Sequence, residues 1–273
     1  MALRKLQTDI LRVIAKNRDP ESYIAGGLAL NRDWPRYSKD VDIFQDRQDR
    51  LIQASEADAA ALTAAGFSVN WTRRLESVRS ADVARGDEKT GIDWAWDSDY
   101  RFFPAVPDPE FGFALHPLDL ATNKVSAAVS RREPRDALDL LSIHEKLIPL
   151  GAVVWAACDK SPGWTPEGMI EEMRFTSLRY RSDDYALIDS AEPIDPHKVA
   201  ADLRKALHDA EEFVLRMPTE KAGLLFLKEG KAVQPDPNRL SDYVEHRAQR
   251  RGHWPSSPEI GHALIQRYLQ DKQ

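Results

Sequence analysis

Cysteine is nearly absent from the sequence, with Cys158 the single example among 273 residues. One cysteine excludes an intrachain disulfide framework and a zinc site built from cysteines. Long hydrophobic runs are also missing, because no stretch approaches the roughly 18 apolar residues that cross a bilayer. The N-terminal "MALRKLQTDILRVIAKNRD" is charged throughout and lacks the apolar segment of a secretory signal. We therefore expect a cytoplasmic protein with no membrane partner.

An excess of positive charge is missing as well. Lys and Arg total 38 while Asp and Glu total 44, so the formal net charge is −6. This balance argues against a protein that coats nucleic acid, although a local basic groove is compatible with it. Hydrophobic residues make up 42% and charged residues 30%, which is typical of a globular chain. The length suffices for one large domain or two ordinary ones.

The hydrophobic pattern changes near residue 150. Residues 1–150 alternate helical and strand-like segments, which predicts an α/β (α+β) unit with a mixed sheet. Residues 151–273 are expected to form a mostly helical second domain. The predicted strands are 22–27, 38–46, 67–75, 76–84 and 90–99. The predicted helices are 3–17, 28–32, 51–66, 117–130, 134–147, 166–179, 197–215, 218–227 and 258–270.

Two aspartates stand two residues apart in the predicted strand "SKDVDIFQD". Side chains alternate along a strand, so Ser38, Asp40 and Asp42 share one face. Paired carboxylates repel each other unless a cation lies between them, and Mg²⁺ takes hard oxygen ligands. Two such ions about 3.5–4 Å apart clamp the attacking and leaving oxygens in phosphoryl transfer. Asp93, which lies between apolar residues of a later strand, is the candidate third ligand.

Candidate donors for a phosphate stand close to the same strand. Gly26 and Gly27 end one predicted strand and open a helix, where backbone amides can approach a phosphate closely. Arg36 and Ser38 add side-chain donors. Each feature also has an ordinary explanation, because glycine pairs are most often simple turns and Asp93 at a strand end could face water. Their order and spacing together favour a site for phosphates and metal.

The stretch "GGLAL…RYSKDVDIF", residues 26–44, resembles the opening motif of the nucleotidyltransferase superfamily. The likeness is strongest to the AbiEii/AbiGii-type toxin family, whose pattern is roughly Gly-Gly-Thr-Ala-Leu and then Arg-x-Ser-x-Asp-x-Asp. Leu28 stands where that family has threonine. A second match, "LATNKVSAAVSRREPRDALDL", supplies the family lysine and a later arginine–aspartate cluster. The resemblance covers residues 20–147.

This resemblance implies a nucleotidyltransferase-like mixed β-sheet with flanking helices, followed by the mostly helical domain. It implies metal-dependent transfer of a nucleotide from an NTP to an acceptor hydroxyl, with two Mg²⁺ ions. The implied acceptor is an RNA end such as tRNA, and the implied role is the toxin of a toxin–antitoxin or phage-defence system with a cognate antitoxin. The implied metal ligands are Asp40, Asp42 and Asp93. The implied catalytic residues are Asp40, Asp42, Asp93, Lys124, Asp136 and Asp139. The implied nucleotide-binding residues are Gly26, Gly27, Arg36, Ser38, Lys124 and Arg135.

The residues of the second motif also have ordinary explanations. Lys124 lies on a helix of small and apolar residues, where a lysine usually extends its amine to water. Arg135 and Asp139 have the spacing of a simple helix pair, and Asp136 near a helix start complements the dipole. Both motifs occur in the expected order, which favours the functional interpretation.

Three arginines near the C-terminus are candidate RNA contacts. Arg247, Arg250 and Arg251 stand beside an aromatic residue in "HRAQRRGHW". A solvated helix face is the simpler explanation of these charges. Two other functions stay open: the acidic stretch 182–195 is compatible with a small-molecule, antibiotic-modifying nucleotidyltransferase, and the fold could also serve as a degenerate nucleotide-binding module.

Overall fold

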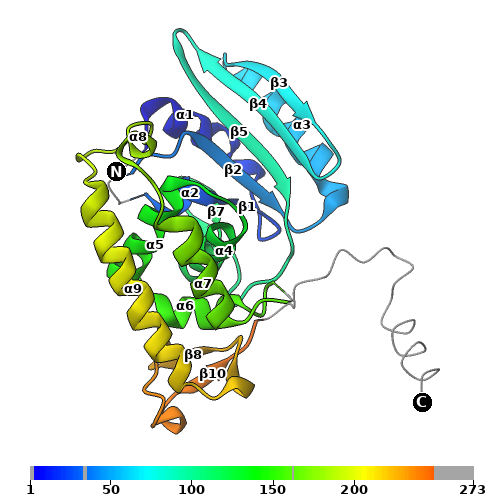
Figure 1. The fold of residues 1–273 in the computed structure, drawn as a ribbon. Helices are drawn as coiled ribbons and strands as arrows, with labels where there is room; N and C mark the ends of the chain where they lie inside the picture. Colours follow the sequence, from blue (N-terminus) through cyan, green and yellow to red (C-terminus); the bar gives the residue numbers. More distant parts are fainter. Residues whose placement is uncertain (1–2, 33–35, 162, 249–273) are drawn as a thin grey trace, which may run out of the picture.

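The computed structural model describes residues 3–32, 36–161 and 163–248. These residues form a seven-stranded sheet with helices on both faces and a helical body that ends in a three-stranded sheet (Figure 1). The large sheet is mixed, because the β1–β7 and β2–β5 pairs are parallel and the other pairs are antiparallel. The predicted mixed sheet with flanking helices is confirmed.

The strand order of the large sheet is β3-β4-β5-β2-β1-β7-β6, so β2 and β5 are neighbours near its centre. The strands are β1 (Ser22–Ala25), β2 (Asp40–Gln45), β3 (Ser68–Arg74), β4 (Val78–Arg85), β5 (Glu88–Trp96), β6 (Val106–Asp108) and β7 (Gly112–Ala114). The sequence pattern did not predict β6 and β7, because three-residue strands are too short to show a period.

Helices α1 (Lys5–Ile14) and α3 (Gln48–Ala64) cover one face of this sheet. The apolar residues Leu6, Ile10 and Ile14 recur at four-residue spacing on α1 and are buried against the sheet. Burial of one such side chain contributes about 1.5–3 kcal/mol. The face of the sheet beneath α1 and α3 is therefore a dry core, and any site must lie on the opposite face.

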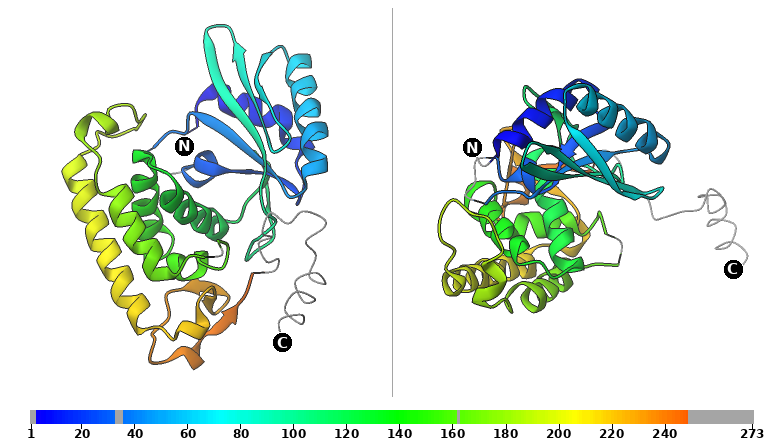
Figure 2. Two further views of the ribbon diagram at one scale, coloured as in Figure 1. Left: turned by 45° about the vertical axis from the view of Figure 1, so that its right-hand side comes forward. Right: turned by 90° about the horizontal axis from the view of Figure 1, so that it is seen from above.

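The opposite face of β1 packs against the helical body, in which α6 is the central helix. Its sequence "LGAVVWAA" is buried along its whole length between α4 and α9. A helix that is apolar on all sides has no amphipathic period, which is why the sequence did not predict it. Strands β3, β4 and β5 extend away from this body (Figure 2). The remaining helices are α2 (Gly26–Leu30), α4 (Pro117–Ser130), α5 (Pro134–Lys146), α6 (Leu150–Ala157), α7 (Pro166–Ser177), α8 (Ser182–Tyr185) and α9 (Pro196–Arg216).

The predicted helix at 218–227 is wrong. The segment forms a 3₁₀ turn at Thr219–Lys221 and then enters a strand. Gly223 interrupts it with a φ of +85°, and a Cβ at this position would lie 2.6 Å from the Cβ of Asp159. A right-handed helix cannot pass through this left-handed backbone. The three-stranded sheet consists of β8 (Leu225–Lys228), β9 (Lys231–Val233) and β10 (Val244–His246).

Other expectations about the second half of the chain have mixed outcomes. The predicted helices at 166–179 and 197–215 correspond to α7 and α9, whereas the one at 258–270 lies outside the described residues. The division into domains at residue 150 stays a prediction. Within the described ranges no single helix has the length and apolar composition to span a membrane. Helices α5 and α6 have that length and composition only when taken together, and they are bent by 114° at their junction.

Candidate active site

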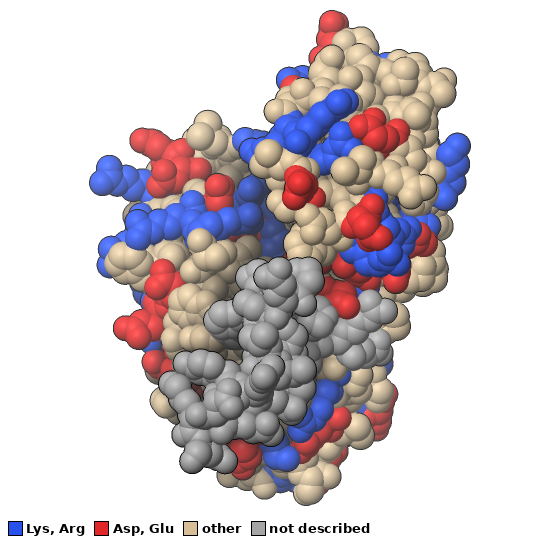
Figure 3. All heavy atoms as spheres, turned by 90° about the vertical axis from the view of Figure 1, so that its right-hand side faces the viewer, with Lys and Arg blue, Asp and Glu red and all other residues tan. Residues whose placement is uncertain are grey.

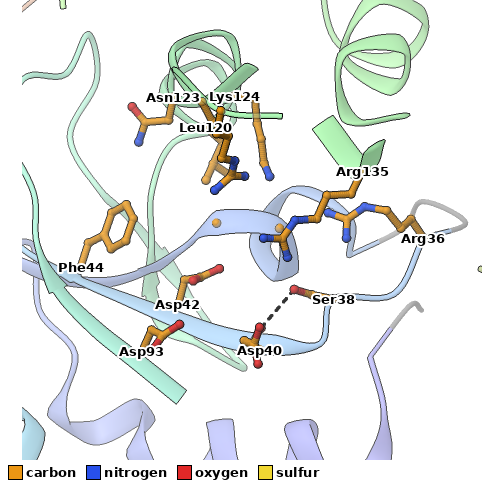
Figure 4. Close-up of a pocket in the computed structure, with 14 residues that line it drawn as sticks. Arg36, Ser38, Asp40, Asp42, Phe44, Asp93, Leu120, Asn123, Lys124 and Arg135 are labelled. Carbon is orange, nitrogen blue, oxygen red and sulfur yellow. Dashed lines mark hydrogen bonds between the residues drawn. The ribbon is translucent and has the colours of Figure 1, made fainter. Parts of the chain in front are cut away.

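Three carboxylates share one face near the centre of the sheet. In β2, Asp40 and Asp42 alternate with Val41 and Ile43, which are fully buried on the other face. β5 runs parallel to β2 with Asp93 directly opposite Asp42. Asp42 and Asp93 therefore lie side by side, and Asp40 follows one step along β2 toward Ser38 (Figure 4). The two strands that carry these acids are neighbours in the sheet, and their pairing brings the three carboxylates together.

Two glycines leave room for the carboxylates. Gly26 has a left-handed φ of +65°, and a Cβ there would lie 1.8 Å from Oδ2 of Asp42. On β5, a Cβ on Gly91 would lie 2.3 Å from Oδ1 of Asp40. A larger residue at either position would displace a carboxylate. The sequence interpretation missed Gly91, although a glycine inside a strand often marks such a close approach.

A pocket of about 240 Å³ opens above the carboxylates. Strands β2 and β5 form its floor, and α4 with the start of α5 forms the facing wall (Figure 4). Lys124, Arg131 and Arg135 come from this wall. The pocket thus has an anionic floor and a cationic wall. The predicted site residues that line it are Gly26, Gly27, Arg36, Ser38, Asp40, Asp42, Asp93, Lys124 and Arg135.

Asp139 lies behind the cationic wall and is fully buried. Its carboxylate accepts hydrogen bonds from Arg36 at 2.9 and 3.0 Å and from Asn31 at 3.0 Å. The Nζ of Lys124 lies 2.6 Å from its Oδ2. Burial by itself would raise the pKa of Asp139, but Lys124 and Arg36 hold it below its ordinary value. Asp139 therefore fixes two of the cations that line the pocket.

Asp136 fixes another cation of the pocket wall, Arg131, in the same way. It accepts two hydrogen bonds from Arg131, at 2.7 and 2.8 Å, and lies 3.7 Å from Lys124. Arg135 is bound less tightly: its Nε has no hydrogen-bond partner among the described residues, and the carboxylate of Glu133 lies 3.6 Å from it. The buried Nε of Arg135 thus lies without a close acceptor among the residues that the structure describes.

Burial and mutual repulsion perturb the acids of the floor. Burial raises the pKa of Asp42 to about 6, with Asp93 and Asp40 adding to the effect and Lys124 opposing it. Burial and then Asp93 raise the pKa of Asp40. Within the described part of the chain, no ion pair or hydrogen bond engages these three carboxylate groups. A cluster of this kind favours a cation or protons.

Comparison with known proteins decides the fold. No family model matches the chain, and no curated protein matches it either. MenT4, a nucleotidyltransferase toxin from Mycobacterium tuberculosis H37Rv, has a similar structure, with a TM-score of 0.54 and 16% identity over 76% of this chain and 82% of that one. The chain has the nucleotidyltransferase fold. JHP933 from Helicobacter pylori aligns with a TM-score of 0.48 and 13% identity over 79% of this chain and 94% of the other.

The predicted nucleotidyltransferase fold is thus confirmed, and the narrower likeness to the AbiEii/AbiGii-type toxins stays a prediction. In this nucleotidyltransferase fold, Leu28 occupies the family's threonine position. It is buried in the core beneath α1 and does not line the pocket. The exchange of threonine for leucine therefore removes no group from the pocket surface.

The three floor carboxylates of the nucleotidyltransferase fold have the chemistry of Mg²⁺ ligands, since they offer hard oxygens from adjacent positions on one face. Among the described residues, no three Asp, Glu, His or Cys side chains are arranged so that they could hold a metal ion as they stand. Like charges spread apart when no cation lies between them. Metal binding would therefore have to draw these side chains together.

Of the three arginines predicted to contact RNA, the structure describes one, and it lies outside this pocket. Arg247 is exposed just after β10 and does not line the pocket. Arg250 and Arg251 lie outside the described residues. A role of these three in binding RNA stays a prediction.

An aromatic ring and an amide occupy one end of the pocket, and sequence reasoning missed both. Phe44 shares the face of Asp42 on β2, so strand alternation could have identified it. Asn123 on α4 accepts a hydrogen bond of 2.6 Å at its Oδ1 from Lys160, which also bonds Asp97 at 3.1 Å. Because lysine only donates, the amide nitrogen of Asn123 is the group left for the pocket (Figure 4). Nothing in the sequence links Asn123 to the distant Lys160.

Proposed function

We propose that the protein is a metal-dependent nucleotidyltransferase that moves a nucleotide from an NTP to a hydroxyl of an RNA end such as tRNA. The observation that carries this proposal is a pocket with an anionic floor and a cationic wall in a nucleotidyltransferase fold. A magnesium–NTP complex has the complementary distribution of charge, because the metal pairs with carboxylates and the triphosphate with arginine and lysine.

The triphosphate is assigned to the end of the pocket near Gly27, Arg36 and Ser38. A Cβ on Gly27 would lie 2.7 Å from Nη2 of Arg36 and 3.2 Å from Oγ of Ser38, so the backbone there is close to both donors. Asp139 orients Arg36 through its Nε and Nη2, and Nη1 donates to the carbonyl of Tyr37 at 3.2 Å. The second N–H of each Nη is left for a ligand. Arg135 also lines the pocket, where its guanidinium adds positive charge.

The reaction follows from this placement. Two Mg²⁺ ions held by Asp40, Asp42 and Asp93 would lower the pKa of the acceptor hydroxyl and stabilise the leaving pyrophosphate. Asp93 is assigned as the base that takes the hydroxyl proton. The hydroxyl oxygen bonds to the α-phosphorus of the NTP, and the bond from that phosphorus to the bridging oxygen of pyrophosphate breaks. Lys124 and Arg135 offset the negative charge on the departing group.

The biological part of the proposal comes from the family resemblance and from the solved toxin that shares the fold. It comprises an RNA acceptor, a toxin role opposed by a cognate antitoxin, and a cytoplasmic location. The alternative of a small cationic acceptor would draw on the acidic stretch 182–195. Residues of this stretch line a separate hollow and none of them lines the pocket described above.

Incubation of the protein with each α-labelled NTP, Mg²⁺ and total tRNA tests the proposal. Label is expected on RNA and not in samples with EDTA, because transfer requires the metal. A parallel set of reactions with aminoglycosides in place of RNA tests the alternative, a small cationic acceptor. Label on an aminoglycoside would replace the RNA acceptor, and magnesium-dependent NTP binding without any transfer would identify a binding module.

The nucleoside is assigned to the end of the pocket with Phe44 and Asn123. A base can stack on the exposed part of the Phe44 ring, which contributes about 1–3 kcal/mol in comparable sites. The amide of Asn123 then donates to an acceptor atom on the base or the ribose. Lys160 holds this amide in one orientation, so the contact selects among nucleotides by the position of their acceptors.

Asn123→Ala is expected to raise the KM for the preferred NTP about fivefold, because one hydrogen bond contributes about 1 kcal/mol. The same change should narrow the differences in kcat/KM among the four NTPs. Steady-state kinetics with each NTP and saturating RNA measures both effects. Asn70→Ala, on the exposed strand β3, is the control and should match wild type. An unaltered ranking and KM in Asn123→Ala would remove this residue from the nucleoside site.

A further inference from the structure

Two arginines each lie over the same exposed aromatic ring, that of Phe175 on α7. Phe175, near the end of α7, is 39% exposed. The guanidinium carbon of Arg179 lies 3.9 Å from its ring centroid, and that of Arg132, in the loop between α4 and α5, lies 4.8 Å from it. Such cation–π contacts hold the guanidinium groups in place at the surface. We name Arg132, Phe175 and Arg179 the arginine stack.

The arginine stack is linked to residues that line the pocket by the chain itself and by one hydrogen bond. Thr176, the residue after Phe175, donates a hydrogen bond of 2.9 Å from its hydroxyl to the carbonyl of Ala128 on α4. Ala127, which precedes Ala128, lines the pocket, and so does Arg131, the chain neighbour of the first arginine of the stack. Figure 3 shows Lys and Arg side chains across the surface at its left, up to the hollow that separates this surface from the part at the upper right. Positive charge thus continues from the pocket wall onto this surface.

The arginine stack has no acidic partner in the described part of the chain. Among the residues that the structure describes, neither Arg132 nor Arg179 forms an ion pair, whereas Arg174 on the same helix pairs with Glu211 at 2.7 Å. Each planar guanidinium therefore keeps donors in the fork arrangement that matches a phosphate. A surface with fixed, unpaired guanidinium groups beside a catalytic pocket fits a chain of phosphates.

We propose that the arginine stack binds the sugar–phosphate backbone of the single-stranded end of the RNA acceptor and directs its terminal hydroxyl into the pocket. This inference rests on the proposed function. A single strand fits because only an unpaired end can pass from an exposed surface into a pocket of about 240 Å³. Arginines combined with an aromatic ring are also the groups on which single-stranded nucleic acids bind.

Fluorescence anisotropy with a short labelled single-stranded RNA tests the surface without requiring catalysis. The double variant Arg132→Ala/Arg179→Ala is expected to raise the Kd at least about tenfold, and the slope of its salt dependence should fall by about 0.7 for each phosphate that the variant no longer binds. Phe175→Leu keeps both charges and an apolar side chain but removes the ring that holds the guanidinium groups. The Kd of this variant for the RNA should lie between those of the double variant and the wild type.

Arg12→Ala/Lys16→Ala is the matched control, because it removes two exposed charges near α1, on the other side of the sheet. It should bind the RNA as wild type does. Equal Kd values for the stack variant and this control would overturn the proposal. Binding of duplex RNA as tightly as single-stranded RNA would overturn the single-strand assignment. Thermal unfolding of each variant confirms that the folded proteins are compared.

The transfer reaction separates this inference from the function on which it rests. In the stack variant the KM for RNA should rise at least about tenfold, while the KM for NTP stays near that of wild type. Transfer with an unchanged KM for RNA would keep the proposed function and reject the surface. Stack-dependent RNA binding without any transfer by the wild-type protein would keep the surface and reject the proposed function.

Discussion

Asp42→Asn is expected to lower the rate of nucleotide transfer by about 10³-fold or more. A bound metal contributes several kcal/mol of charge stabilisation in the transition state, and about 1.4 kcal/mol corresponds to a factor of ten. Asp42 is the central carboxylate of the cluster, with Asp40 on the same strand and Asp93 opposite it on β5. Its neutralisation therefore disrupts the whole metal site. Single-turnover transfer of labelled nucleotide to RNA at saturating Mg²⁺ measures the effect.

The same substitution is expected to stabilise the protein in EDTA at neutral pH. Burial, with Asp93 and Asp40, raises the pKa of Asp42 to about 6, whereas an aspartate in the unfolded chain ionises near pH 4. Stability is therefore lost as the pH rises from about 4 to 6, and it stays lost above that range. Asparagine cannot ionise, so the variant should gain about 1–2 kcal/mol at neutral pH, allowing for partial solvent screening. Denaturant titrations near pH 4 and pH 7 should show the gain only at the higher pH.

Asp82→Asn is the control for both measurements. Asp82 lies on β4 opposite Gly91, on the same side of the sheet, but it pairs with Lys89 at 2.7 Å and does not line the pocket. Its replacement should leave transfer close to wild type. Retained transfer in the Asp42 variant would contradict the catalytic assignment, and a loss of stability in EDTA at neutral pH would contradict the account of its pKa.

Asp139→Asn is expected to destabilise the protein by about 3–5 kcal/mol, because it leaves buried cations without their counter-ion. Arg36 and Lys124 both contact the Asp139 carboxylate, which is fully buried. The two cations hold the pKa of Asp139 below its ordinary value against the effect of burial. The stabilisation is therefore present above the ordinary carboxyl pKa and disappears as the pH falls below it. Thermal unfolding should show a Tm lower by roughly 10 °C at neutral pH, with a smaller difference in acid.

Glu133→Gln provides a comparison from the same region, because Glu133 is partly exposed and forms a weak ion pair, with its carboxylate 3.6 Å from Nε of Arg135. It should change stability by less than about 0.5 kcal/mol. The double variant Asp139→Asn/Lys124→Met should lose less stability than the two single changes together, since it removes a stranded charge. A Tm of Asp139→Asn close to that of wild type, or strict additivity in the double variant, would show that Asp139 does not fix the positions of Arg36 and Lys124.

Elements with a strong local signal were predictable. The alternation in β2 predicted that Asp40 and Asp42 share a face, and Asp93 stood out as an acid between apolar residues of a later strand. The pairing that places Asp93 opposite Asp42 came from the structure. The elements that were missed lack such a signal. Helix α6 is apolar on every side, β6 and β7 are three residues long, and the segment 218–227 looked helical until Gly223 in its left-handed conformation interrupted it.

The sequence by itself determined which side chains share a strand face and which glycines precede them, because those relations follow from spacing along one segment. Together with the family resemblance, which supplied Lys124 and Arg135, these relations identified most of the residues that line the pocket. Only the tertiary structure decided that Asp139 holds the cationic wall, that Lys160 orients Asn123, and that Arg132 meets Phe175 and Arg179. These partners lie on separate helices and loops, and their contacts arise when the buried helices pack together. No local pattern in the chain encodes that packing.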